Sequence, residues 1–169
     1  MFYFNIFFLF AFMGHIIENI VYPKVDSGIL YGIWTPIYGI GCISIILINN
    51  FLDRFKFKFY IKIPLLFFTS AIILAIIETI GGYFIEILFG RVFWSYYNHF
   101  IPIGKYTSIQ MMGLWGCCSI FLIYIIIPIV NNFIYKIPRY ITHFLIFIFI
   151  SDFIYTYSKL ANFFPHFFN

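Results

Sequence analysis

Residues 63–89 read IPLLFFTSAIILAIIETIGGYFIEILF, and this stretch decides the class of the protein. Apolar side chains fill almost all of it, and it is longer than the roughly 20 residues that a helix needs to cross a bilayer. Its only proline, Pro64, stands at the second position, where a helix loses least from a missing N–H group. The stretch therefore predicts a membrane-spanning helix.

The composition of the whole chain agrees with this prediction. The 169 residues are 63% hydrophobic, 25% aromatic and only 9% charged, with a mean hydropathy of +0.99. Soluble domains carry about one quarter charged residues, so this chain has too few polar side chains to cover a water-facing globule. This excludes a separate soluble catalytic domain, and we expect residues 1–169 to form one integral membrane domain.

Four further apolar stretches have the length and composition of membrane spans. With the first one described, the predicted spans cover about residues 2–21, 31–48, 63–89, 109–130 and 141–157. The first span lacks a positively charged start and a small-residue cleavage site, so we expect it to stay in place as a helix. The predicted fold is all-α, a polytopic membrane helix bundle of about five transmembrane helices.

The positions of Lys and Arg predict the orientation, because positively charged loops stay on the cytoplasmic side. If the amino terminus lies inside, the inner loops hold six of these residues and the outer segments hold four. The inner ones are concentrated in a single segment that contains Arg54, Lys56, Lys58 and Lys62. We therefore predict a multi-pass protein of the cell membrane, with its amino terminus inside and its carboxy terminus outside.

The same basic segment alternates in polarity from residue 55 to residue 63. A period of two predicts extended structure or an interfacial ribbon. Each Lys near an anionic leaflet contributes about 1 kcal/mol, so the segment is interpreted as a surface that binds lipid headgroups or docks a cytoplasmic partner. Nucleic acid is not an expected partner, because cations beside a membrane are common in any case.

Acidic residues inside the predicted spans need a physical explanation, since a carboxylate at the bilayer centre costs about 2.5–3.5 kcal/mol. Glu78 lies near the middle of the third span, Glu86 follows two turns later, and Glu18 lies close to the end of the first span. Gly81 and Gly82 would let a neighbouring helix approach and supply hydrogen-bond donors. Two interpretations stay open: structural carboxyls held by donors, or sites on a pathway for substrate, protons or cations.

Two blocks of sequence carry a resemblance to a known family. The first covers residues 14–41, GHIIENIVYPKVDSGILYGIWTPIYGIG, and its matching positions are Gly14, Glu18, Gly28, Leu30, Tyr31, Gly32, Pro36, Ile37, Tyr38, Gly39 and Gly41. The second covers residues 78–116, ETIGGYFIEILFGRVFWSYYNHFIPIGKYTSIQMMGLWG, and its matching positions include Glu78, Gly82, Glu86, Trp94, Trp115 and Gly116. Both blocks resemble the motifs of the CmpB family, the ABC-transporter type IV permease-like integral membrane proteins.

The resemblance implies a multi-span permease-like protein whose transported substrate is undefined. The chain departs from the family pattern at His15, where the family usually has Trp, and at Ser95, where it usually has an acidic residue. An activity of the family that required that acid would be missing here.

The glycines of the first block also have a physical interpretation of their own. Gly32, Gly39 and Gly41 surround Pro36 and Tyr38 and would give a helix a flat surface of small residues and a place to break. Broken helices in transporters expose backbone groups that bind ions or substrate. Close helix packing alone is the other interpretation.

The sequence shows no motif for catalysis of its own. It contains no Gly-rich phosphate loop, no Ser, His and Asp set and no His-Glu-x-x-His motif. We therefore expect no enzymatic activity, no cofactor and no metal, and any ATP hydrolysis must take place in another chain.

Two functions remain in view. The leading hypothesis is a membrane permease subunit of an ABC-type transport system, with a cytoplasmic ATP-binding subunit on the Lys-rich segment. One chain of this length encloses little of a pathway, so a homo- or hetero-oligomer is expected. The alternative is a non-transport scaffold or regulatory protein of the cell envelope, in which the glycines and acids serve helix association.

Overall fold

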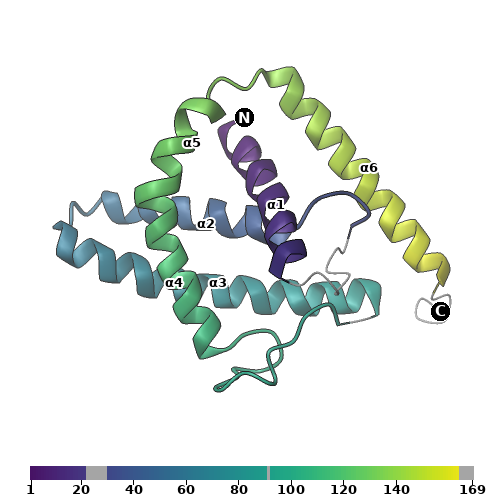
Figure 1. Cartoon of the computed structure of the whole chain (residues 1–169), viewed down its shortest axis with the longest axis horizontal. Coiled ribbons are helices and arrows are strands. Elements are labelled where there is room, and N and C mark those ends of the chain that lie inside the picture. The colour runs from purple at the N-terminus through teal and green to yellow at the C-terminus, as the bar shows by residue number, and fades with distance from the viewer. Residues whose placement is uncertain (22–29, 91, 164–169) are drawn as a thin grey trace.

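The computed structural model describes residues 1–21, 30–90 and 92–163, without the side chains of residues 160–163. Its helices are α1 (Phe2–Val21), α2 (Pro36–Asp53), α3 (Phe59–Phe89), α4 (Ile109–Phe121), η1 (Leu122–Ile126), α5 (Ile127–Ile134) and α6 (Arg139–Phe163), as Figure 1 shows. Within these ranges five helical stretches are long and apolar enough to cross a membrane, since α4, η1 and α5 run on as one. The prediction of an all-α membrane protein with about five spans is confirmed.

The second helix lies about five residues later than the sequence indicated. Pro36 is at its first turn, where the missing N–H costs least, and the helix continues to Asp53. Thr35 is not helical, and its N–H donates to the carbonyl of Ala11 on α1 at 2.9 Å. Leu30 and Trp34, which precede Pro36, are buried in one cluster with Phe8 of α1 instead of extending α2.

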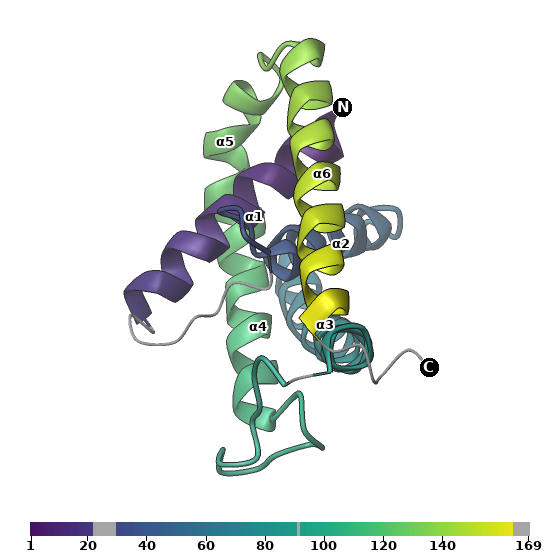
Figure 2. The ribbon, with the colours of Figure 1, turned by 90° about the vertical axis from the view of Figure 1, so that its right-hand side faces the viewer.

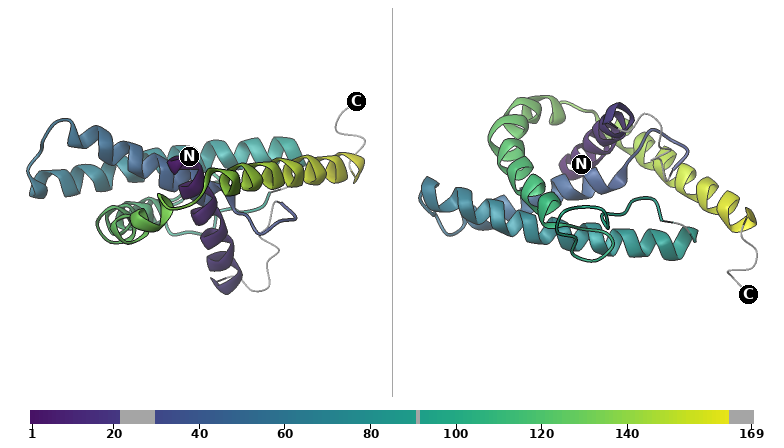
Figure 3. Two further views of the ribbon diagram at one scale, coloured as in Figure 1. Left: turned by 90° about the horizontal axis from the view of Figure 1, so that it is seen from above. Right: turned by 60° about the horizontal axis from the view of Figure 1, so that its bottom comes forward.

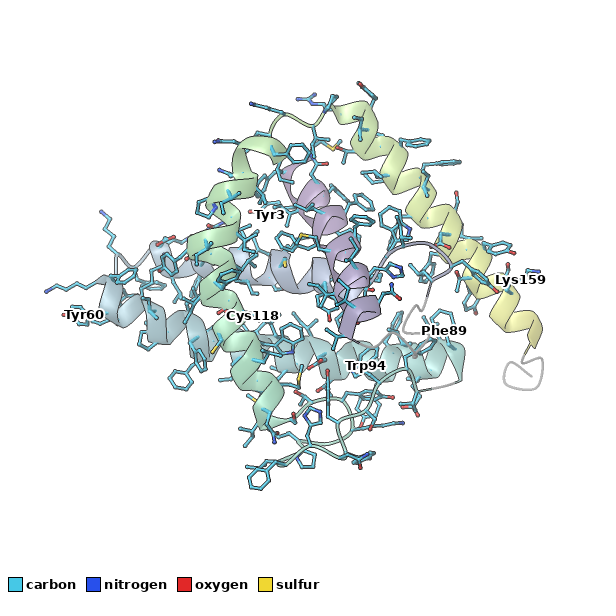
Figure 4. The ribbon with its side chains drawn as sticks, viewed as in Figure 1. Tyr3, Tyr60, Phe89, Trp94, Cys118 and Lys159 are labelled. Carbon is cyan, nitrogen blue, oxygen red and sulfur yellow. The ribbon has the colours of Figure 1, made fainter. Side chains whose placement is uncertain are left out.

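The third helix begins earlier than expected, at Phe59, and residues 54–56 form a turn in which Lys56 has φ 50°. The predicted extended ribbon over residues 55–63 is therefore wrong at residues 55–56 and again from Phe59 onward. Tertiary contacts at the α2–α3 turn explain the difference. Lys62 forms an ion pair with Asp53 at 2.6 Å, and its ammonium lies 5.7 Å from the centre of the Tyr124 ring. Helical geometry at the start of α3 turns Lys62 toward these partners. The two contacts favour a helix here more strongly than a short alternating pattern favours an extended strand. Figure 4 marks the two ends of α3 at Tyr60 and Phe89.

One wide turn interrupts the helix from Ile109 to Ile134. Residues Leu122–Ile126 form a π-helix, and Pro128 follows in the first turn of α5. A proline donates no hydrogen bond to the carbonyl four residues earlier, and its ring crowds that carbonyl. A π-bulge relieves this crowding, so the chain continues as one span and does not break.

The helices cross one another and do not form a parallel bundle. α2 and α3 lie side by side as an antiparallel pair (Figure 1). In Figure 2 this pair is seen nearly end-on, whereas α4–α5 and α6 run up the picture. The left panel of Figure 3 views the molecule from above and shows α1 running across the direction of the pair. The main apolar core lies where α1, α2, α3, η1 and α5 meet, and it includes Ile6, Phe10, Ile45, Ile46, Leu74, Leu122 and Ile134.

A buried polar contact ties the first helix to the last two. The Thr142 hydroxyl on α6 donates to Asn5 Oδ1 at 2.6 Å, and Asn5 Nδ2 donates to the carbonyl of Ile134 at 3.4 Å. Asn5 is 4% exposed and Thr142 is fully buried. This contact fixes α6, which packs against few other residues, to the amino-terminal end of α1.

Candidate functional site

The central feature is a buried carboxylate on α3. Glu78 is 5% exposed, and each of its carboxylate oxygens accepts one hydrogen bond. The Tyr96 hydroxyl donates to Oε1 at 2.8 Å, and the Trp115 Nε1–H donates to Oε2 at 3.2 Å. The Thr107 hydroxyl also lies near this carboxyl, but outside hydrogen-bonding geometry. Within the described ranges no Lys, Arg or His forms an ion pair with Glu78.

The two donors to Glu78 come from different elements. Tyr96 lies in the α3–α4 loop, residues 92–108, and Trp115 lies on α4. The loop folds back on itself, because the N–H of Tyr96 donates to the carbonyl of Lys105 and the N–H of Ile103 donates to the carbonyl of Thr107, both at 2.9 Å. Gly104 makes the turn between them with φ 73°, a left-handed conformation that glycine adopts without a Cβ penalty. The result is a compact loop beside the second half of α3 (Figure 3).

The end of this loop is fixed to the start of α4. Ser108 caps α4 by accepting a hydrogen bond from the N–H of Met111 at 3.3 Å. The same hydroxyl lies 3.0 Å from His99 Nδ1, and the His99 ring contacts the Tyr96 ring edge-on. These contacts hold Tyr96 in position to donate to Glu78.

The same loop satisfies the second acid of α3. Both Lys105 Nζ and the Tyr106 hydroxyl donate to Glu86. The hydrogen bond to Glu86 raises the pKa of Lys105 above its ordinary value, so the bond favours the charged ammonium. Tyr106 is 1% exposed and its ring lies directly on Gly82, where any side chain would collide with it.

The glycines of α3 therefore do permit a close approach, but chiefly to a loop tyrosine. The sequence predicted donors on a neighbouring helix, and Trp115 on α4 is such a donor. The other three donors, Tyr96, Lys105 and Tyr106, lie in the α3–α4 loop. None of these three was predicted as a donor: their signal in the sequence was the aromatic and basic composition of residues 90–108 and, for Tyr96, a matching position in the second block.

Glu78 borders a partly open cavity of about 250 Å³ between α1, α2, α3, α4 and η1. Apolar side chains form nearly all of its wall, and Glu78 is the only acidic or basic one among the described residues that line it. The rings of Tyr38 and Trp115 stand edge to face at 6.0 Å on the same wall. Figure 4 marks Cys118, another wall residue, on α4. The arrangement suits binding of a ligand better than chemistry on one.

Both sequence blocks meet at this cavity. Gly14, Tyr38 and Gly41 of the first block and Glu78 and Trp115 of the second all line it. The Tyr38 ring packs against Gly14 so closely that a Cβ there would overlap it. Residues more than 100 positions apart in the chain, from Gly14 to Trp115, thus build a single wall.

Other motif residues serve helix packing or local bonding. Gly39 packs against Phe7 and Gly116 against Phe67, each at a distance that excludes a side chain. The ring of Trp94 contacts that of Tyr106 at 5.7 Å. α2 runs without a break from its Pro36 start through its glycines, so the broken-helix interpretation is wrong for residues 36–53.

The three candidate acids do not form one site. Glu18 lies at the end of α1, where the Thr35 hydroxyl donates to it at 3.3 Å, and it does not line the cavity. Glu86 is held by the loop and does not line the cavity either. Within the described ranges no group of three or more His, Cys, Asp or Glu residues could hold a metal ion.

Two motif glycines lie before α2. Gly32 donates its N–H to Asp152 on α6 at 3.0 Å, whereas Gly28 lies outside the described residues.

The basic segment lies apart from this cavity, at the α2–α3 turn. Arg54, Lys56 and Lys58 are exposed there, whereas Lys62 is half-buried and paired with Asp53. Lys56 has a left-handed backbone with φ 50°, which closes the tight turn. Three of the four predicted docking cations therefore face outward.

Comparison with known proteins agrees with the resemblance seen in the two blocks. The family model of CmpB, described as "Putative ABC-transporter type IV", matches residues 5–157. No curated protein and no solved structure matches the chain significantly. The matched region covers most of the chain and includes all five spans apart from a few terminal residues. The chain is a multi-pass membrane protein that belongs to the CmpB family of ABC-transporter type IV proteins.

Proposed function

We propose that the chain is a permease subunit of an ABC-type transport system and acts with a separate ATP-binding subunit. The observation that carries this proposal is the Glu78 carboxylate on the wall of a cavity built by four spans. Membership of a transport family gives this cavity its context. A buried ionisable group inside a membrane bundle is the usual mark of a substrate or ion site.

The proposed role is binding and movement of a ligand without covalent chemistry. Glu78 is held by the hydroxyl of Tyr96 and the indole of Trp115, neither of which is an activated nucleophile. We propose accordingly that the chain is not an enzyme and that ATP hydrolysis belongs to the partner.

The α2–α3 turn is the proposed docking site for that partner and for anionic lipid. Arg54, Lys56 and Lys58 are exposed on it, and positive loops stay in the cytoplasm. On this proposal the amino terminus lies inside and the carboxy terminus outside the cell membrane.

The proposed working form is a homo- or hetero-oligomer. Only 11% of the apolar stretch of α6 is buried, against 33% for α1 and for α3. A second membrane-embedded chain packed along α6 would enlarge the pathway that a single copy cannot enclose.

The experiment that tests the proposal is capture of the tagged chain from its own membrane in mild detergent, with mass spectrometry of the proteins that remain bound. The test variant is Lys56→Gln/Lys58→Gln. The matched control is Lys136→Gln/Arg139→Gln, which removes two exposed cations from the other predicted inner loop. We expect an ATP-binding protein with the wild type and the control, and at least tenfold less of it with the test variant.

A scaffold role is the second candidate, and the packing glycines favour it. The contacts of Gly14 with Tyr38, Gly39 with Phe7 and Gly116 with Phe67 serve helix association and need no ligand. Capture of envelope proteins without any ATP-binding protein would support this role and contradict the transport proposal.

A further inference from the structure

We propose that the Glu78 cavity binds a small organic cation that carries one positive charge on an apolar body. This inference rests on the proposed function, because such a cation would be the ligand that the subunit moves or senses. The size of the cavity, its apolar wall and its single charge support the inference.

The size and wall of the cavity fit an apolar body. A cavity of about 150 Å³ lined by aliphatic and aromatic groups holds a benzene ring. The cavity beside Glu78 has about 250 Å³, which leaves room for a ring or a short alkyl chain with a charged head. Its wall includes the side chains of Ile45, Leu74 and Leu122.

The charge of the cavity fits a single positive head. A carboxylate offers about four lone-pair positions, and Tyr96 and Trp115 occupy two of those on Glu78. None of the cations in the described part of the chain pairs with it. A bound cation would supply the missing counter-charge for a carboxylate that is costly to bury alone.

The aromatic pair adds a second attraction for a cation. Tyr38 and Trp115 both border the cavity, and their rings meet edge to face at 6.0 Å. The faces of Trp and Tyr rings attract organic ammonium groups, especially where water is excluded. A carboxylate beside two such rings is a common way to recognise an alkylammonium head.

Other classes of ligand fit less well. Ca²⁺ and Mg²⁺ take six or more oxygen ligands, whereas the described wall residues offer one carboxylate, and none of the described residues form a group of three or more His, Cys, Asp or Glu that could hold a softer metal ion. An anion would be repelled by Glu78, and a sugar would find few hydrogen-bond partners among the apolar side chains. A lipid acyl chain would fill the space but would leave the carboxylate without a counter-charge.

The experiment is isothermal titration of the detergent-purified full chain with benzyltrimethylammonium as the probe. Glu78→Gln removes the charge and keeps the shape of the side chain. Glu86→Gln is the matched control, since it removes the same charge from the same helix but outside the cavity wall. We expect saturable binding to the wild type, binding within about twofold for Glu86→Gln, and at least tenfold weaker binding for Glu78→Gln.

A second variant keeps the test decisive if Glu78→Gln does not fold. Gly41 lines the cavity, and a Cβ there would meet only Leu74 at 3.4 Å, so Gly41→Leu should fill the space and leave Glu78 intact. We expect at least tenfold weaker binding of the probe to Gly41→Leu.

Two results would overturn the proposal. The first is absence of saturable binding to the wild type, or equal binding to all variants. The second comes from a thermal-unfolding measurement on the same purified protein, with neopentylbenzene as the uncharged molecule of the same shape. If neopentylbenzene raised the unfolding temperature as much as benzyltrimethylammonium does, an apolar occupant such as an acyl chain would explain the cavity. Binding is measured on the isolated chain, so its failure would leave the capture of an ATP-binding protein as an independent test of the transport role.

Discussion

Replacement of two adjacent glycines by alanine tests how the α3–α4 loop is held on α3. A Cβ at Gly81 would lie 3.7 Å from Ile37, an ordinary contact, whereas a Cβ at Gly82 would overlap the Tyr106 ring. In both variants alanine stabilises the helix itself by about 0.5–1 kcal/mol relative to glycine. The pair therefore separates the collision from the helix propensity.

The magnitude follows from what Tyr106 must give up. The ring is 1% exposed, and forcing a buried group aside costs about 1–3 kcal/mol. Its hydroxyl donates to Glu86, and a hydrogen bond to a charged group contributes about 1.5–3 kcal/mol. After the helix gain, we expect Gly82→Ala to lower the free energy of unfolding by about 2–5 kcal/mol, and Gly81→Ala to leave it unchanged or raise it slightly.

The assay is unfolding of the purified protein in mixed micelles with increasing sodium dodecyl sulfate. Tryptophan fluorescence reports the transition and is sensitive to the loop, since the ring of Trp94 contacts that of Tyr106. Equal free energies of unfolding for the two variants, within about 0.5 kcal/mol, would refute the contact between Tyr106 and Gly82.

Three further predictions concern the buried polar contacts and the orientation. Tyr96→Phe removes a donor to Glu78 and should lower the free energy of unfolding by about 1.5–3 kcal/mol. Tyr97→Phe, at the exposed neighbour, should change it by no more than about 0.5 kcal/mol, and equal effects of the two variants in the same unfolding assay would contradict the contact. Thr142→Val keeps the shape of the side chain but removes the hydrogen bond to Asn5. In a membrane protein this should lower the free energy of unfolding by about 0.6–1.7 kcal/mol, and an unchanged value would show that the bond contributes nothing. A carboxy-terminal alkaline phosphatase fusion should be active and a carboxy-terminal green fluorescent protein fusion dark, and the reverse pattern would overturn the predicted orientation.

Hydropathy was enough to predict the class and the approximate spans. Burial of apolar length dominates the energetics of membrane helices, so the long stretch through Glu78 is recognised without any other information. The ends of the helices were less accurate where local contacts decide them. The hydrogen bond of Thr35 to Ala11 and the ion pair of Lys62 with Asp53 are tertiary contacts that no periodic pattern contains.

The sequence predicted the acids of the candidate site and, through the family resemblance, the cavity-wall positions Gly14, Tyr38, Gly41 and Trp115. The cost of a carboxylate within a span singled out Glu78 and Glu86, and both have donors in the structure. The donors themselves were missed because Tyr96 and Lys105 lie in an irregular loop, 18 and 19 positions from the acids that they bind. The cavity could not be predicted at all, since it depends on how four helices cross.

ATP hydrolysis by the complex captured with the tagged chain is the decisive measurement for the proposed transport role. We expect hydrolysis above that of a mock capture, and we expect benzyltrimethylammonium to change the rate with the wild type but not with Glu78→Gln. Hydrolysis no higher than in the mock capture, or a rate that responds to the cation equally in both chains, would show that the proposed role is wrong.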